Sequence, residues 1–233
     1  MRVLRCSKFV VAIDGPAGAG KTTVAKLLAR HLGWMHIDTG AMYRAIALKA
    51  LRLNVPLDDE GKLAAIASSA RIELVSLPNG TQRVLLDGED VTEAIRTPAV
   101  DEAVSIVSAH SAVRKALQTL QRKLAECSHV IAEGRDMQTI VFPDADLKVF
   151  LTASLEERAR RRWLELRSKG YDVTIEEEIE RTKKRDELDA TRADSPLAMA
   201  SDAVVIDTTH MTPQEVVERM LSLIEQRLRQ RRG

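Results

Sequence analysis

The chain has 233 residues, of which 45% are hydrophobic, 30% are charged and only 3% are aromatic. This composition is typical of a single folding unit with an aliphatic core, and it excludes a disordered chain. The 35 basic and 34 acidic residues nearly balance, so the net charge gives no support to general binding of nucleic acid or of a membrane surface.

The cysteines, the histidines and the N-terminus exclude further classes of protein. Cys6 and Cys127 form no CxxC pair and the histidines are scattered, which argues against a disulfide framework or a metal cluster. The apolar run FVVAI is shorter than a signal peptide needs, and no stretch approaches the ~20 apolar residues of a membrane helix. We therefore expect a soluble, cytoplasmic protein.

The first predicted elements alternate between strand and helix. The continuous apolar run at residues 9–13 is typical of a strand that is buried on both faces in a parallel sheet. Residues 21–32 predict a helix with one apolar face that ends at Gly33. WMHID at 34–38 and the apolar periodicity over 40–54 predict a second strand and a second helix.

The middle of the chain has a different pattern. The alternating runs RIELVSL and QRVLLDG are separated by a turn sequence at residues 78–80, which is a strong hairpin signal. We predict a small antiparallel insert over residues 66–96. A helix begins after Thr97, which is followed by proline, and another covers 111–127.

The last third returns to alternating strands and helices. HVIAEGRD and DLKVFL predict two more buried strands, and Ser154 opens a capping box before an arginine-rich helix. A helix over 174–189, a strand AVVID near residue 205 and a helix after Thr212 complete the pattern. Strands separated by helices predict an α/β fold with a parallel sheet and right-handed crossovers.

Residues 15–22 match the phosphate-binding pattern G-x-x-x-x-G-K-[ST], between a predicted strand and a predicted helix. In such a loop, backbone N–H groups point at phosphate oxygens, and the helix N-terminus adds partial positive charge. Lys21 would reach the terminal phosphates, and Thr22 would offer its hydroxyl to Mg²⁺. A glycine-rich turn with a chance lysine is the alternative, which the flanking elements disfavour. The motif predicts binding of a nucleoside triphosphate.

Polar and charged residues follow two other predicted strands. Thr39 and Arg44 come after the second strand, and Glu133, Arg135 and Asp136 end the strand HVIAEGRD. Ligands of open α/β sheets bind at the carboxyl ends of the strands, so these residues are candidates for a site. A helix cap, a solvated charge and a structural ion pair are the alternative explanations.

Arginines are dense on two later predicted helices. Arg158 and Arg162 share a helical face, and Arg185, Asp189 and Arg192 fall in one stripe. An exposed, salt-bridged face is the common alternative. Two unit charges ~4 Å apart repel by about 4 kcal/mol at an effective dielectric of ~20, so an enzyme that moves phosphate onto phosphate needs such cations. We expect phosphoryl transfer that depends on positioning and electrostatics, with no general base.

These motifs together resemble those of bacterial cytidylate kinases, a family of nucleoside monophosphate kinases. The matching segments are IDGPAGAGKTT, IDTGAMYRA, LDGEDVTEAIRT, AEGRDMQTIVFPDA, SLEERARRR and RDELDATRADSPL followed by DAVVIDTT. The resemblance implies one P-loop kinase core over 1–233, built as a three-layer α/β sandwich. It implies a monophosphate-binding region over 38–110 that includes the insert, and a short helical lid over 153–172.

The resemblance also implies an activity. It is ATP-dependent phosphorylation of CMP or dCMP, with Mg²⁺, in pyrimidine nucleotide metabolism. The expected enzyme is a cytoplasmic monomer that binds neither membrane nor nucleic acid. One residue departs from the family pattern, since Gln138 stands where the family usually has glycine.

The resemblance assigns roles to individual residues. Catalysis would depend on Lys21, Arg135, Arg162, Arg185 and Arg192. The residues implied to bind ATP are Gly15, Pro16, Ala17, Gly18, Ala19, Gly20, Lys21, Thr22, Thr23, Arg158 and Arg162, with Thr22 also on Mg²⁺. Those implied to bind CMP are Thr39, Arg44 and Tyr43 at the phosphate and sugar, Ser105, Arg114 and Asp136 at the cytosine, and Arg135, Arg185, Asp189 and Arg192 at the phosphates and ribose.

Two alternatives stay open. The chain could be a P-loop kinase for another nucleoside monophosphate or small molecule, which a panel of acceptors would distinguish. From a different class, the basic terminus EQRLRQRRG suggests a nucleotide-dependent RNA-binding regulator. The same terminus is explained as the solvated end of the last helix, where basic residues complement the helix dipole.

Overall fold

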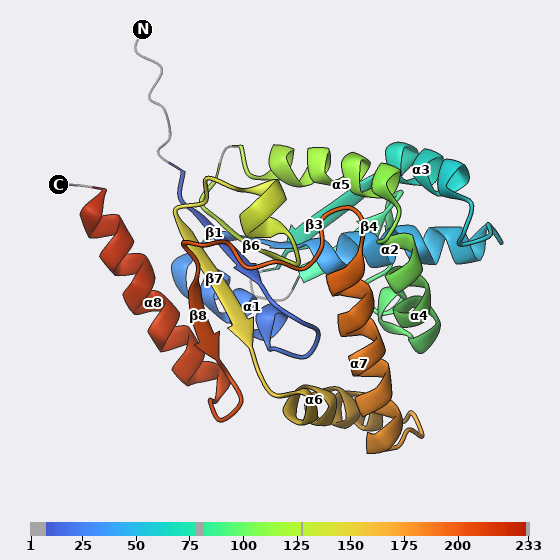
Figure 1. The fold of residues 1–233 in the computed structure, drawn as a ribbon. Helices are drawn as coiled ribbons and strands as arrows, with labels where there is room; N and C mark the ends of the chain where they lie inside the picture. Colours follow the sequence, from blue (N-terminus) through green and yellow to red (C-terminus); the bar gives the residue numbers. More distant parts are fainter. Residues whose placement is uncertain (1–7, 78–81, 127, 232–233) are drawn as a thin grey trace, which may run out of the picture.

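A five-stranded parallel sheet lies at the centre of the protein, in the strand order β2-β6-β1-β7-β8. The computed structural model describes residues 8–77, 82–126 and 128–231. The strands of this sheet are β1 (Val10–Asp14), β2 (Met35–Asp38), β6 (Val130–Gly134), β7 (Leu147–Thr152) and β8 (Val204–Asp207). Figure 1 shows the sheet between two groups of helices. The predicted parallel α/β fold is confirmed.

Two apolar clusters, one on each side of the sheet, hold the layers together. The first joins the sheet to α1 (Lys21–Leu32) and α8 (Pro213–Gln230). The second joins it to α2 (Thr39–Arg52), α3 (Glu60–Ser69), α4 (Pro98–Val107) and α5 (Ser111–Leu124). Aliphatic residues dominate both clusters, as the low aromatic content predicts.

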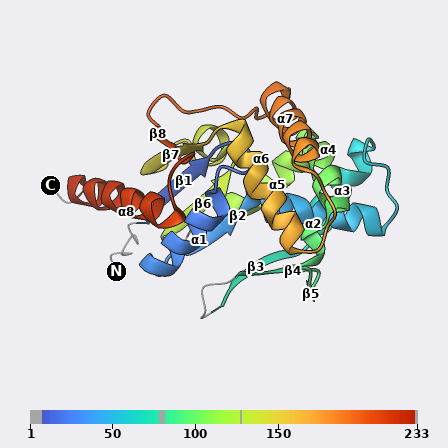
Figure 2. The ribbon, with the colours of Figure 1, turned by 90° about the horizontal axis from the view of Figure 1, so that it is seen from below.

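Helices α6 (Leu155–Ser168) and α7 (Ile175–Thr191) pack against each other beyond the carboxyl ends of the strands (Figures 1 and 2). Ser154 caps α6 by accepting a hydrogen bond from the Glu157 N–H, as the sequence predicts. Thr174 caps α7 in the same way, with a complete capping box. This helical pair therefore begins at well-defined points and covers the edge where ligands bind in such sheets.

The predicted antiparallel insert is real but smaller than the sequence indicates. Its strands are β3 (Ile72–Ser76), β4 (Gln82–Leu86) and β5 (Glu89–Asp90), and β3 pairs with β4. The first residues of the predicted insert belong instead to α3, a helix that the sequence analysis did not predict. The predicted turn at 78–80 lies outside the described residues. Alternate residues of β4 are buried, so the hairpin packs one face on the core.

The turn after β1 requires glycine at its first residue. Gly15 has a φ of 150°, and a Cβ there would lie 2.0 Å from the carbonyl oxygen of Leu151. Gly18, with a φ of 77°, would place a Cβ 2.8 Å from Arg158. Both positions lie where the backbone of the loop passes close to a neighbouring element, so the predicted phosphate-binding loop has the local geometry that its glycines imply.

A single π-helical turn, η2 (Met137–Val141), follows β6 and was not predicted. Asp14 holds its start, since its carboxylate accepts hydrogen bonds from the N–H groups of Met137 at 3.0 Å and Gln138 at 2.8 Å. The buried amide of Gln138 donates to the Val149 carbonyl at 3.0 Å and accepts from the Ala200 N–H at 3.1 Å. Gln138 thus fastens the segment after α7 to the sheet, which glycine could not do.

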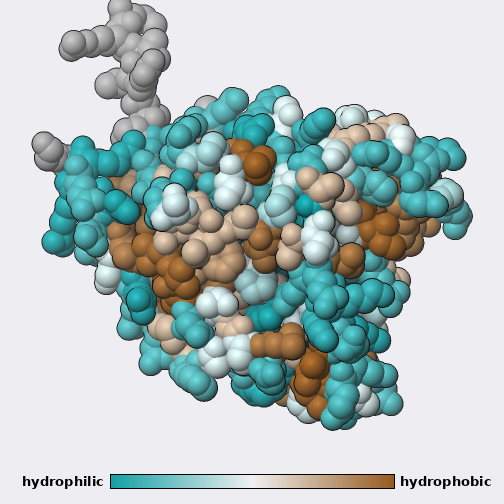
Figure 3. Space-filling model, in the orientation of Figure 1, coloured by the Kyte–Doolittle hydropathy of each residue, from teal (hydrophilic) through white to brown (hydrophobic). Residues whose placement is uncertain are grey.

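The surface seen in Figure 3 is largely hydrophilic, with smaller hydrophobic areas between polar ones. Exposed large apolar side chains, such as Leu164, Leu188, Met199 and Val205, lie on different elements. Across the described part of the chain, no helix has both the length and the apolar character needed to cross a bilayer.

Candidate active site

A cavity of about 770 Å³ opens at the carboxyl ends of the parallel strands. Its wall is built from the phosphate-binding loop, the start of α2, the end of β6 and the facing sides of α6 and α7. The predicted site residues that line it are Ala17, Gly18, Ala19, Gly20, Lys21, Thr22, Thr23, Thr39, Tyr43, Arg44, Arg114, Arg135, Asp136, Arg162, Arg185, Asp189 and Arg192. Gly15, Pro16, Ser105 and Arg158 lie outside this lining.

Lys21 lies folded against the loop that carries it. Its Nζ donates to the carbonyl oxygens of Gly15 at 2.8 Å and Pro16 at 2.7 Å. Burial and the positive charge of Arg135 lower the pKa of Lys21 well below its usual range. A buried ammonium held only by two carbonyls beside a guanidinium is short of negative charge, so an anion in the loop would stabilise it.

Thr22 and Glu133 meet next to the loop. The Thr22 hydroxyl donates to one carboxylate oxygen of Glu133 at 2.9 Å, and the other oxygen lies 2.9 Å from Nε2 of His36. Hydroxyl and carboxylate oxygens are ligands that Mg²⁺ prefers, so this pair fits the ion. Within the described ranges no cluster of three or more His, Cys, Asp or Glu side chains could hold a metal.

Arginines surround Asp189 in the lining of the cavity. Arg135 and Arg192 approach its carboxylate at 2.7 and 3.1 Å. Burial raises the pKa of Asp189, but Arg135, Arg192 and Arg185 together lower it to about 2. Arg185 is the least compensated member of the group: burial and the charges of Arg135 and Arg44 lower its pKa to about 10. Asp189 and Asp101, which lies 4.0 Å from Arg185, carry less negative charge than these three arginines carry positive charge, so the pocket is suited to a polyanion.

A buried ion pair forms another part of the wall. Arg114 lies 2.6 Å from Asp136, and each side chain is only 2% exposed. The Arg114 guanidinium also lies 5.2 Å from the centroid of the Tyr43 ring, and the amide of Gln118 donates to Asp136 at 3.2 Å. Because the pair is both buried and on the cavity wall, it presents fixed donors and acceptors to a ligand.

Arg158 and Ser105, both expected to touch ligands, have other contacts here. Arg158 is buried beneath the loop: it donates to the carbonyl oxygens of Ala17 at 3.1 Å and Ala153 at 3.0 Å, and it pairs with Asp186 at 2.7 Å. The Ser105 hydroxyl points back to a carbonyl of its own helix, 3.5 Å away. In this arrangement Arg158 stabilises the phosphate-binding loop through its hydrogen bond to Ala17.

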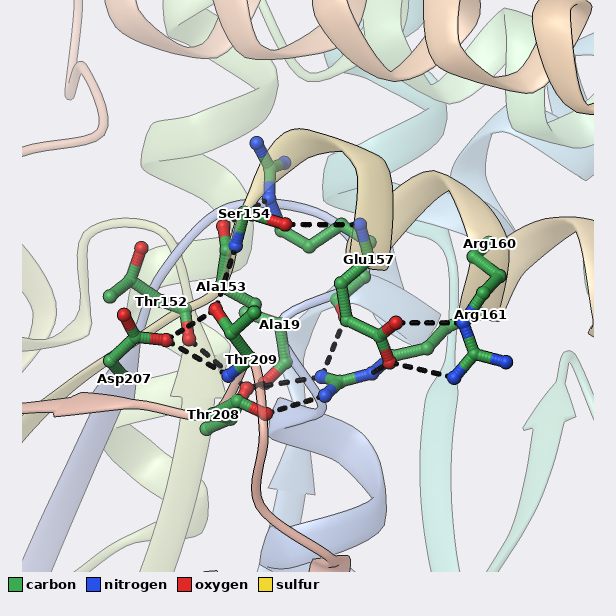
Figure 4. Close-up of polar contacts among 12 residues, drawn as sticks. Ala19, Thr152, Ala153, Ser154, Glu157, Arg160, Arg161, Asp207, Thr208 and Thr209 are labelled. Atoms are coloured by element: carbon green, nitrogen blue, oxygen red, sulfur yellow. Dashed lines mark hydrogen bonds and ion pairs between the residues drawn. The ribbon is translucent and has the colours of Figure 1, made fainter.

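Arg161 was not predicted, yet it joins three elements at the edge of the cavity (Figure 4). It donates to the hydroxyl of Thr208 at 3.0 Å and to the Thr208 carbonyl at 2.6 Å, and it pairs with Glu157 at 2.8 Å. The Thr208 hydroxyl also lies 3.2 Å from the carbonyl oxygen of Ala19 in the phosphate-binding loop. No sequence pattern signals this contact, because the two residues come from α6 and the end of β8.

A phosphate-binding loop and a group of arginines thus line one cavity, at the edge of a parallel sheet that a helical pair covers. These features define a P-loop phosphotransferase. A profile of the cytidylate kinase family matches residues 11–226. The chain belongs to the cytidylate kinase family.

Curated relatives agree with this assignment over nearly the whole chain. A cytidylate kinase from Caldanaerobacter subterraneus is 54% identical over 214 residues, covering 92% of this chain and 93% of the relative. Cytidylate kinases from Geobacter sulfurreducens and Desulfitobacterium hafniense are 51% and 52% identical, and cover 95% and 94% of this chain and 94% and 93% of their own.

Proposed function

We propose that the protein transfers the γ-phosphate of ATP to CMP or dCMP and forms ADP with CDP or dCDP. The observation that carries this proposal is the cavity itself, whose lining brings together the phosphate-binding loop and the guanidinium groups of Arg44, Arg135, Arg185 and Arg192. Membership of the cytidylate kinase family supports cytosine as the base of the acceptor. The same relationship supports a cytoplasmic monomer. Light scattering would test the monomeric state.

The loop binds the triphosphate of ATP. Its backbone N–H groups and the N-terminus of α1 point at the phosphate oxygens, and Lys21 exchanges its two carbonyl partners for the terminal phosphates. Mg²⁺, when bound, neutralises charge on those oxygens, and Thr22 and Glu133 are the residues that would hold it. Arg161 and Thr208 keep the loop in place beneath α6.

The arginines bring the two phosphates together. An oxygen of the acceptor phosphate attacks the γ-phosphorus, the bond from that phosphorus to the β–γ bridging oxygen breaks, and ADP leaves. Arg135, Arg185 and Arg192 reduce the repulsion between the two anions as they approach. The acceptor needs no general base because a phosphate monoester, with its second pKa near 6, is already mostly ionised at neutral pH.

Base recognition is assigned to the Arg114–Asp136 pair. Cytosine presents an amino donor beside ring acceptors, and this pair presents a carboxylate beside a guanidinium. Uracil lacks the amino donor and would leave a buried carboxylate oxygen without its partner, which costs about 1–3 kcal/mol or more. Tyr43 lies against Arg114 and closes the pocket on the sugar side.

A coupled assay of ADP formation with a panel of nucleoside monophosphates tests the proposal. Purified protein with ATP and Mg²⁺ is expected to turn over CMP and dCMP much faster than UMP, AMP or GMP. Product analysis must show CDP, since ADP alone would also come from ATP hydrolysis. Lack of CDP formation would contradict the proposal, and rapid turnover of another monophosphate would favour the alternative kinase.

A further inference from the structure

Asp101 lies on α4, and arginines from three other helices converge on its carboxylate. Arg44 of α2 and Arg162 of α6 both form ion pairs with it. One Nη of Arg185, on α7, lies 4.0 Å from Oδ1 of Asp101. The Asp101 side chain is only 18% exposed. All three arginines were expected to act in the site, whereas no role was expected for Asp101.

Asp101 stands behind the wall of the cavity rather than in it. Arg44, Arg162 and Arg185 line the cavity, whereas Asp101 does not. Arg44 directs one Nη at Asp101 and at the carbonyl oxygen of Ile95, 3.2 Å away, so its remaining N–H groups are available to a ligand. A guanidinium has five N–H donors and can bind a carboxylate and a phosphate at the same time.

The arginines need such a counter-charge because they repel one another. Burial and the positive charges of Arg135 and Arg44 lower the pKa of Arg185 to about 10, and Asp189 and Asp101 act in the opposite direction. Two guanidinium groups a few ångströms apart repel by several kcal/mol at a partly buried site. Without Asp101 the side chains of Arg44, Arg162 and Arg185 would move apart, and a ligand would have to gather them again.

We propose that Asp101 is a positioning residue for the acceptor phosphate: it holds three arginines toward one another, so that a phosphate monoester meets guanidinium groups already assembled. The inference rests on the proposed function, since it takes this wall as the acceptor site. Most of the unfavourable ordering of the arginine side chains then occurs during folding and not on binding. This increases the affinity for the acceptor phosphate. Asp101 also links α4, in the predicted monophosphate-binding region, to α6, in the predicted lid.

The test compares Asp101→Asn with Glu102→Gln. Glu102 is the neighbouring residue on α4, it is exposed, and its substitution makes the same change in charge. Asp101→Asn is expected to raise the KM and the Kd for CMP about tenfold, with a smaller change in the KM for ATP. Glu102→Gln is expected to stay within about twofold of the wild type. In an Arg44→Ala background, the effect of Asp101→Asn is expected to fall clearly below tenfold, because only two of the three arginines that Asp101 holds remain.

Two results would overturn the proposal. The first is CMP binding to Asp101→Asn as tight as or tighter than to the wild type, which would make Asp101 a competing anion. The second is a full tenfold loss that persists in the Arg44→Ala background. A crystal structure of the wild type with CMP gives a measurement that does not depend on the stability of a variant. Arg44 should contact Asp101 and the CMP phosphate together, and an Arg44 that has left Asp101 contradicts the inference.

The outcome also separates this inference from the proposed function. If the wild type and Glu102→Gln form no CDP, the proposed function fails. If the wild type and Glu102→Gln form CDP, and Asp101→Asn has the same KM for CMP as these two proteins, only the proposed role of Asp101 fails.

Discussion

Replacing Arg185 by methionine should stabilise the ligand-free protein while it removes most of the activity. The pKa of Arg185 is lowered to about 10 by burial and by the charges of Arg135 and Arg44, so the folded state disfavours its positive charge. Each pKa unit corresponds to about 1.4 kcal/mol, so the full effect is on the order of 3 kcal/mol. The side chain is 26% exposed, and solvent screening reduces the gain to about 1 kcal/mol.

Methionine keeps the apolar stem of the side chain but carries no charge. A gain of about 1 kcal/mol raises the Tm of a protein of this size by roughly 2–4 °C. The same substitution removes a charge that the transferred phosphate needs, so kcat/KM for CMP should fall about 100-fold or more. Differential scanning calorimetry without ligand and the coupled kinase assay measure the two effects.

Lys184→Met is the matched control for this experiment. Lys184 is the preceding residue on α7, it is exposed, and its substitution removes the same charge. It should change Tm by less than about 1 °C and leave kcat/KM within about twofold. The reasoning is refuted if Arg185→Met lowers the Tm, or if it retains the activity of the wild type.

Three further predictions concern the framework of the site. Gly15→Ala should destabilise the fold by about 3 kcal/mol or more in urea denaturation, because the new Cβ would lie 2.0 Å from a backbone carbonyl, whereas Gly33→Ala, with open space around it, should cost about 1 kcal/mol. Gln138→Gly should cost about 2–4 kcal/mol in the same assay, since it removes one buried and one partly buried hydrogen bond, and a neutral result would show that the amide is dispensable. Burial raises the pKa of Asp14 to about 7, so the folded state binds this proton more tightly than the unfolded state. The wild type should therefore lose stability relative to Asp14→Asn as pH rises from about 4 to about 7. Parallel stability curves for the two proteins would contradict this last prediction.

Much of the fold could be predicted because it depends on interactions between near neighbours in the chain. Short apolar runs and amphipathic repeats predict strands and helices. Ser154 and Thr212 mark the starts of α6 and α8, where each side chain accepts a capping hydrogen bond. The helix α3 was missed because it is short, has glycine as its second residue and ends in two serines, and these residues are typical of a loop. The turn η2 was missed because the N–H groups at its start donate to the carboxylate of Asp14, which is far away in sequence.

The sequence by itself determined the phosphate-binding loop, the alternation of strands and helices, and the set of arginines available for a site. The tertiary structure decided the strand order β2-β6-β1-β7-β8, and with it which of those charges meet. Thr22 reaches Glu133, and Asp101 gathers arginines from three helices, only because two apolar clusters bring distant segments together. Local patterns act through the backbone over a few residues, whereas these contacts depend on how whole apolar faces pack, which no short stretch of sequence encodes.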